Sequence, residues 1–138
     1  MNQLEGTIHE VRTAGNLSVI TIQVKDNELT AVVLENPKDN AYLKPGNQIL
    51  ALFKETEVAI AKDLRGELSI RNRFSGSVEW IETGELLSKI GIRSGDVVLQ
   101  SVITTRSCNQ LNIHPGDRVT ALVKSNEIML MNPLDNEK

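Results

Sequence analysis

The feature that most constrains the fold is an internal repeat. When the sequence is shifted by 70 residues (72 − 2 = 70), it aligns with itself without a gap, and roughly one position in four is identical over about 60 positions. The identical positions include the Pro-Gly pairs at 45–46 and 115–116. The chain is therefore read as two copies of one small module, 1–64 and 65–138, joined near the segment KDLRGEL.

Each copy has the pattern of a small β-protein. In the first copy, the run SVITIQV places Ile20, Ile22 and Val24 on one face of a strand, and three further apolar runs have strand length. A polar stretch before each Pro-Gly turn has room for one short helix. We predict an all-β protein of two tandem OB-like five-stranded β-barrel modules, each with one short helix, because closure removes exposed strand edges.

Composition excludes several classes of function. The net charge of −3 and the aromatic content of 3% argue against a nucleic-acid binder, which needs clustered basic residues or stacking aromatic rings. One cysteine, Cys108, excludes an internal disulfide and suits a reducing compartment. No signal peptide and no apolar run of membrane-spanning length is visible. We expect a cytoplasmic protein that contacts neither membrane nor nucleic acid.

Catalytic and metal-binding constellations are missing from the sequence. His9 and His114 have no counterparts in the other copy, and neither stands at metal-ligand spacing from another His or Cys. Cys108 and His114 lack the orienting acid and the oxyanion loop that a thiol nucleophile would need. No Gly-rich phosphate loop occurs. We therefore expect no enzymatic activity and no bound metal other than one carried as an oxyanion.

The remaining polar residues form a set of hydrogen-bond donors. A lysine ends an apolar strand in both copies, at Lys54 and at Lys124, with a hydroxyl residue close behind it. A single such lysine could simply extend its ammonium group into water, but its recurrence favours an anion site. Charged and hydroxyl donors without a carboxylate suit a small oxyanion. The candidate residues of the second copy are Ser69, Arg71, Asn72, Thr104, Lys124 and Ser125.

Two motifs of the second copy resemble a known family. The segment SIRNRFSGSV is similar to the opening of the Mop or TOBE domain, SARN-x-x-x-G-x-V, and the segment LNIHPGDRVTALVKSNEIML is similar to its close. The first copy has the same close, AYLKPGNQILALFKETEVAIA, so the resemblance covers nearly the whole chain. The chain thus resembles the two-module molbindins and the paired effector module of molybdate-responsive regulators.

The resemblance implies cytoplasmic binding of molybdate, and often of tungstate, by an OB-like barrel with sites at module or subunit interfaces. Ser69 and Arg71 would donate to the oxyanion, as would the hydroxyl of Thr104, and the turn at Lys124-Ser125 would add a charge and backbone N–H groups. A homo-oligomer is implied, and internal pseudo-symmetry favours a trimer over a dimer.

The first copy departs from this motif. It begins at Met1, so no Ser and Arg precede Asn2, and Leu34 stands where the second copy has Thr104. Glu55 replaces the small residue after the lysine, and a carboxylate beside a dianion is repulsive. Its donors are mainly Lys54 and secondarily Thr56, so we expect fewer anions per chain than two complete modules would hold.

Three other functions compete with molybdate storage. A molybdate-sensing module would act on a partner protein or a DNA-binding domain, and the start of the first copy at Met1 favours a free-standing binder instead. An OB-fold nucleic-acid binder conflicts with the charge and the aromatic content. In the last alternative the modules only oligomerise, and Ser69 to Asn72 is a polar linker. The sequence does not rank molybdate against tungstate or sulfate.

Overall fold

The computed structural model describes residues 1–133, which form ten strands, one α-helix and two single-turn 3-10 helices. No helix in this part of the chain is long and apolar enough to cross a membrane. The first repeat contains β1 (Asn2–Ala14), β2 (Leu17–Val24), β3 (Asn27–Val33), β4 (Gln48–Phe53), η1 (Glu55–Glu57) and β5 (Ala59–Ala61). The second contains β6 (Asn72–Thr83), β7 (Leu87–Ser94), β8 (Val97–Thr104), α1 (Thr105–Gln110), β9 (Arg118–Val123), η2 (Ser125–Glu127) and β10 (Met129–Met131).

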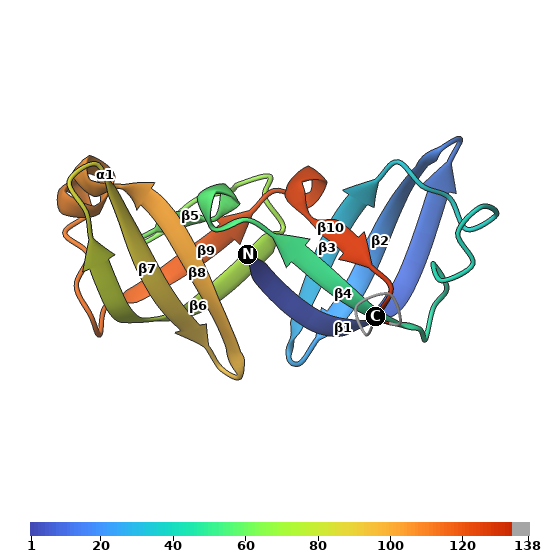
Figure 1. The fold of residues 1–138 in the computed structure, drawn as a ribbon, viewed down its shortest axis with the longest axis horizontal. Coiled ribbons are helices and arrows are strands. Elements are labelled where there is room, and N and C mark those ends of the chain that lie inside the picture. The colour runs from blue at the N-terminus through green and yellow to red at the C-terminus, as the bar shows by residue number, and fades with distance from the viewer. Residues whose placement is uncertain (134–138) are drawn as a thin grey trace. The chain divides into compact units, whose positions relative to one another are not determined.

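The strands form two five-stranded sheets, and each sheet contains one strand of the other repeat. The strand orders are β10-β4-β1-β2-β3 and β5-β9-β6-β7-β8. The colours of Figure 1 display the exchange, because red β10 lies along green β4 while green β5 lies along orange-red β9. In each sheet the exchanged strand also contacts the strand at the opposite edge, β3 or β8. The sheets therefore curl toward closure, which confirms the predicted barrel-like β-modules.

The compact units of the structure are consequently not contiguous in sequence. One unit contains Met1–Asn2 and Lys54–Val123, and the other contains Gln3–Phe53 and, within the described residues, 124–133. The ranges 1–64 and 65–138 describe the periodicity of the sequence. In each packed unit, by contrast, the 3-10 turn and the closing strand come from the other repeat.

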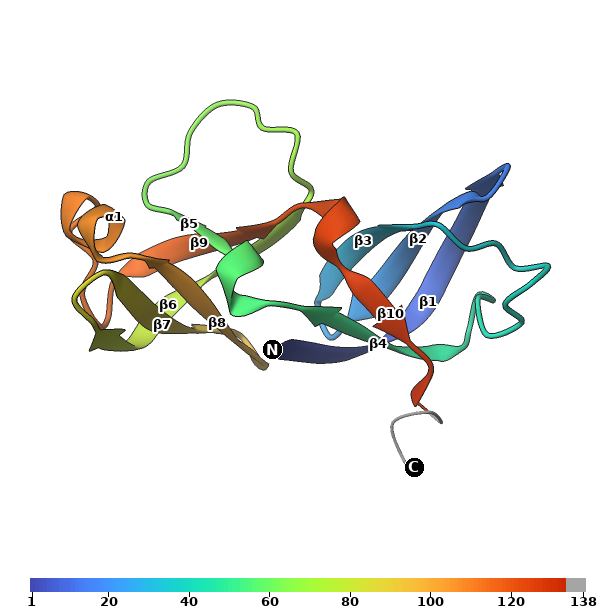
Figure 2. The same ribbon diagram turned by 45° about the horizontal axis from the view of Figure 1, so that its top comes forward.

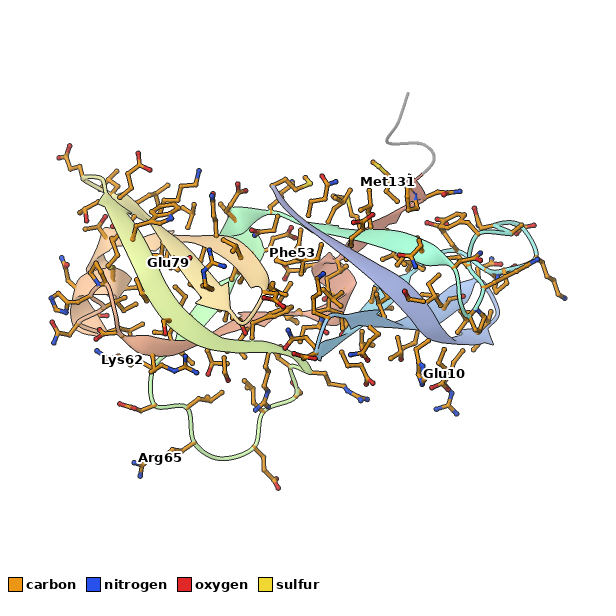
Figure 3. The ribbon with its side chains drawn as sticks, turned by 90° about the horizontal axis from the view of Figure 1, so that it is seen from below. Glu10, Phe53, Lys62, Arg65, Glu79 and Met131 are labelled. Carbon is orange, nitrogen blue, oxygen red and sulfur yellow. The ribbon has the colours of Figure 1, made fainter. Side chains whose placement is uncertain are left out.

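The core of each unit lies on the concave side of its sheet and follows the predicted alternation. Ile20, Ile22 and Val24 are all buried on one face of β2, and the exposed or half-exposed residues between them face outward. The two phenylalanines, Phe53 and Phe74, are fully buried, and Figure 3 shows Phe53 among side chains inside the ribbon. Burial of such side chains contributes about 1.5–3 kcal/mol each.

One glycine recurs in both repeats because the neighbouring strand approaches it closely. A Cβ atom on Gly6 would lie 2.7 Å from the carbonyl oxygen of Gln23, and one on Gly76 would meet the carbonyl of Arg93. Backbone atoms cannot retreat as a flexible side chain can. The position therefore accepts only glycine, which explains the identity at this point of the repeat.

The predicted short helix forms in the second repeat alone. Thr104 is the N-cap of α1, and its Oγ1 accepts a hydrogen bond from the backbone N of Ser107 at 3.1 Å. In the first repeat Leu34 occupies the cap position and cannot accept a hydrogen bond, and Pro37 lacks an N–H group. The corresponding stretch of the first repeat forms turns rather than an α-helix, so the expectation of one helix in each module was wrong for this repeat.

Two polar side chains fasten the exchanged segment of the first repeat to its unit. Ser101 on β8 is fully buried, and its Oγ donates to the carbonyl of Val58 at 2.6 Å. Lys62, just after β5, directs its Nζ at the carbonyls of Leu111 (3.3 Å) and Asn112 (2.8 Å) and at Oδ2 of Asp117 (3.2 Å). These contacts satisfy the carbonyl groups that follow α1 and hold β5 against β9.

Candidate functional site

The Ser-Ile-Arg segment that distinguishes the second repeat lies in a loop before β6. Residues 62–71 have no regular secondary structure, and Figure 2 shows them as a long arch between β5 and β6. Ser69 and Arg71 are exposed, at the end of the arch that enters β6. In Figure 3, Arg65 points outward from the middle of the arch and Lys62 lies at its start. The two predicted donors are therefore accessible to a ligand from solvent.

A residue that the motif did not single out braces this segment. The guanidinium of Arg73, on β6, donates from Nε to the carbonyl of Ile70 and from Nη2 to the carbonyl of Leu68, both at 2.8 Å. The two carbonyls flank Ser69. The bidentate shape of the arginine fork fits this arrangement of two acceptors. No sequence signal separated this arginine from an ordinary exposed strand residue.

The recurring asparagine at the start of β1 and β6 is buried rather than presented to solvent. In the first repeat, Asn2 uses its side-chain amide like a strand backbone, because Nδ2 donates to the carbonyl of Gln100 at 2.8 Å and Oδ1 accepts from the backbone N of Gln100 at 2.7 Å. Asn72 is fully buried as well. For Asn2 the structure therefore shows a role in fixing the beginning of the long strand against β8.

The recurring lysine has the same local conformation in both repeats. Lys54 and Lys124 are exposed, each follows a buried strand end, and each is the extended N-cap residue of a 3-10 turn, with ψ angles of 149° and 143°. Behind them, Ser125 is half-buried and Thr56 is exposed. The turn thus presents an ammonium group with a hydroxyl one or two residues later, which is the donor set expected for an oxyanion.

In the first repeat this turn already holds a negative charge. Oε1 of Glu55 accepts a hydrogen bond from the α-amino nitrogen of Met1 at 2.6 Å. That bond, then the backbone N–H of Glu55, and then the charges of the terminal ammonium and Lys89 lower the pKa of this carboxyl group below its ordinary value. In the alignment of the repeats, Met1 corresponds to Arg71 and Glu55 to Ser125. The first repeat therefore has an ion pair between Met1 and Glu55 at the two positions where the second repeat has the donors Arg71 and Ser125.

Thr104 is engaged in its own helix cap. Besides accepting from the backbone of Ser107, its Oγ1 donates to Oγ of Ser107 at 2.8 Å. The hydroxyl of the next residue, Thr105, is also engaged in hydrogen bonds. It shares one with Ser88 at 2.9 Å and donates one to the carbonyl of Gly84 at 2.8 Å. Thr104 could donate to an anion only by giving up its bond to Ser107.

The predicted residues are distributed over both compact units. One unit holds Lys54, Thr56, Ser69, Arg71, Asn72 and Thr104, whereas Lys124 and Ser125 belong to the other. Within residues 1–133, no three His, Cys, Asp or Glu side chains gather into a cluster that could hold a metal ion. The chemistry offered by the exposed candidates is therefore that of cationic and neutral hydrogen-bond donors, which suits binding of an anion.

The chain matches the TOBE domain family over residues 1–60 and 68–130. It is 34% identical over 108 residues to the molybdenum-pterin-binding protein MopB of Rhodobacter capsulatus, with 77% of this chain and 40% of that protein covered. It is 29% identical over 132 residues to the molybdenum transport protein ModE of Azotobacter vinelandii, with 94% and 48% covered. The chain thus spans about half the length of the curated relatives it matches or less.

A solved structure resembles the chain along most of its length. A crystal structure of the cytoplasmic molybdate-binding protein ModG, with molybdate bound, matches with a TM-score of 0.88 and 26% identity, and the match covers 94% of each chain. The match to this bound structure extends over both repeats, as does the family match.

Proposed function

The chain belongs to the TOBE domain family, in which it carries two copies of the domain, and on this premise we propose that it binds molybdate without catalysing a reaction on it. The observation that carries the proposal is the donor set of the second repeat, in a chain similar to molybdate-binding proteins: Ser69, Arg71 and Lys124 are exposed and Ser125 is half-buried. A tetrahedral dianion offers several acceptor oxygens to such donors. Tungstate has the same shape and charge and is expected to compete.

We assign the fuller donor set to the second repeat. In the first repeat, Glu55 and the α-amino group of Met1 neutralise each other, which leaves Lys54 and Thr56 as the donors. Asn72 supports the segment by its buried position at the start of β6, and Thr104 contributes only if its cap rearranges. We therefore expect the chain to bind fewer anions than two complete motifs would hold.

The biological role proposed is storage or homeostasis of molybdate in the cytoplasm by a homo-oligomer, with a trimer preferred over a dimer. Interfaces are the expected place for sites whose donors are divided among modules or subunits. Light scattering on the protein with and without molybdate measures the assembly directly.

Calorimetric titration with molybdate, tungstate and sulfate tests the binding proposal. Arg71→Ala and Lys124→Ala should each weaken molybdate binding at least tenfold, because each removes a charged donor worth about 1.5–3 kcal/mol. Arg65→Ala is the matched control, since Arg65 is an exposed arginine of the same arch. Wild-type affinity in both donor variants would refute the site, and no heat with any of the anions would refute the function.

A sensing role is the second candidate, because 94% of this chain matches a part of ModE that makes up 48% of that protein. In that case the module would act on a partner protein or on a DNA-binding domain. Immunoblotting of the natural source separates the two roles, because this chain has a mass of 15.3 kDa. A larger product that carries a second domain supports sensing, and a product of this mass supports storage.

A further inference from the structure

Arg73 makes two contacts that bear on the direction of backbone donors in the arch. Its guanidinium binds the carbonyls of Leu68 and Ile70, each at 2.8 Å. These carbonyls belong to the peptide units that also contain the N–H groups of Ser69 and Arg71. The described chain has no cis peptide bonds, so each N–H group points opposite to the carbonyl of its own unit.

The two carbonyls converge on one guanidinium, so the N–H groups of Ser69 and Arg71 are both directed away from Arg73. We propose that Arg73 is a positioning residue that holds these two N–H groups, together with the Ser69 hydroxyl, in the orientation that receives an oxyanion. This inference rests on the proposed function and deepens it. Arg73 acts through the arch and is not itself assigned as an anion ligand.

The arch needs such a brace because it lacks regular secondary structure from 62 to 71. Ordering each backbone residue costs roughly 1–2 kcal/mol of conformational entropy. A segment that is ordered before the ligand arrives does not bear this cost on binding, which raises affinity. The first repeat has Gln3 at the position of Arg73, and a glutamine side chain lacks the planar guanidinium fork that contacts two carbonyls at once.

Arg73→Gln and Arg73→Lys together test the role. Lysine keeps the positive charge but loses the planar fork that spans two carbonyls. We expect both variants to weaken molybdate binding about tenfold, and to speed amide hydrogen exchange at Ser69 and Arg71, with little change in melting temperature. Arg93→Gln is the control for lost charge, since Arg93 pairs with Glu79 on an exposed strand face, and it should bind as the wild type does.

The outcomes separate positioning from simple attraction by charge. Positioning is supported if the affinity loss in Arg73→Lys, expressed as a logarithm, is more than half of the loss in Arg73→Gln. A smaller loss in Arg73→Lys means that the positive charge suffices and overturns the inference. Amide hydrogen exchange adds a second criterion, because Arg73 contacts the peptide units that contain the N–H groups of Ser69 and Arg71. Unchanged exchange at these two groups in both variants would overturn the inference as well.

The experiment also distinguishes failure of this inference from failure of the proposed function. A wild-type protein that binds no molybdate refutes the function. A wild-type protein that binds molybdate, beside Arg73 variants of unchanged affinity, refutes only the role of Arg73. The exchange measurement needs no anion and reports on the brace in either case.

Discussion

The pair formed by Trp80 and Gly91 provides the sharpest test of how the two repeats diverged. The two residues lie opposite each other on β6 and β7, and at the same place in the first repeat Glu10 lies opposite Thr21. Trp80 is 37% exposed, while Gly91 is buried beneath it. We predict that Gly91→Thr is destabilising in the wild-type protein but not in a chain that also carries Trp80→Glu.

The magnitude follows from the space above Gly91. A Cβ atom there would lie 2.8 Å from Cζ2 of Trp80, with two further indole atoms closer still, whereas carbon atoms in contact are about 3.5–4.0 Å apart. The ring must therefore retreat by about 1 Å or more. Overpacking of this kind costs about 1–3 kcal/mol. Without the indole, threonine replaces glycine in a strand, which is neutral or stabilises by up to about 1 kcal/mol.

Thermal and denaturant unfolding of the four proteins in this cycle measures the coupling between the two positions. Each kcal/mol corresponds to roughly 2–8 °C in melting temperature for domains near this size. The chain has one tryptophan, so a red shift in the emission of the Gly91→Thr variant reports displacement of the indole directly. Equal effects of Gly91→Thr with and without Trp80 would refute the reasoning.

Three further predictions concern the polar contacts of the exchanged segment. Ser101→Ala should lower the free energy of unfolding by about 1–3 kcal/mol, because the carbonyl of Val58 loses its buried donor; an unchanged denaturation midpoint would contradict this. Lys62→Met keeps the apolar stem but removes the ammonium contacts, so amide exchange in β5 should accelerate while exchange in β10 does not. The hydrogen bond from Met1 lowers the pKa of Glu55, so Glu55 stabilises the fold fully above its ordinary pKa of 4.5, and this stabilisation is lost as the pH falls through its lower pKa in the folded protein. Glu55→Gln should remove that part of the acid dependence of the melting temperature.

Much of the fold could be read from periodicity, because alternation along a strand reports burial directly. The repeat predicted five strands per copy, and the buried face of β2 contains the residues expected there. The helix was predicted less well, since a polar stretch of suitable length does not by itself form a helix. The cap hydroxyl of Thr104 and its absence at Leu34 decided which repeat has the helix.

The types of donor in the candidate site were also visible in the sequence, as was the difference between the two copies. What could not be read was how each group is engaged. Arg73 contacts backbone carbonyls, which carry no sequence signal, and Met1 reaches Glu55 across more than fifty positions of the chain. Such contacts depend on where the backbone places groups that are distant in sequence.

The sequence by itself determined that this protein is a doubled β-module of the TOBE type with unequal copies, because composition, periodicity and motif spacing are local properties. Only the tertiary structure decided which strand completes which sheet. β5 and β10 occupy equivalent positions in the repeat, so either strand offers the same backbone hydrogen bonds to β4 or to β9. The choice between these partners depends on how the folded chain brings them together, which no local pattern of residues encodes.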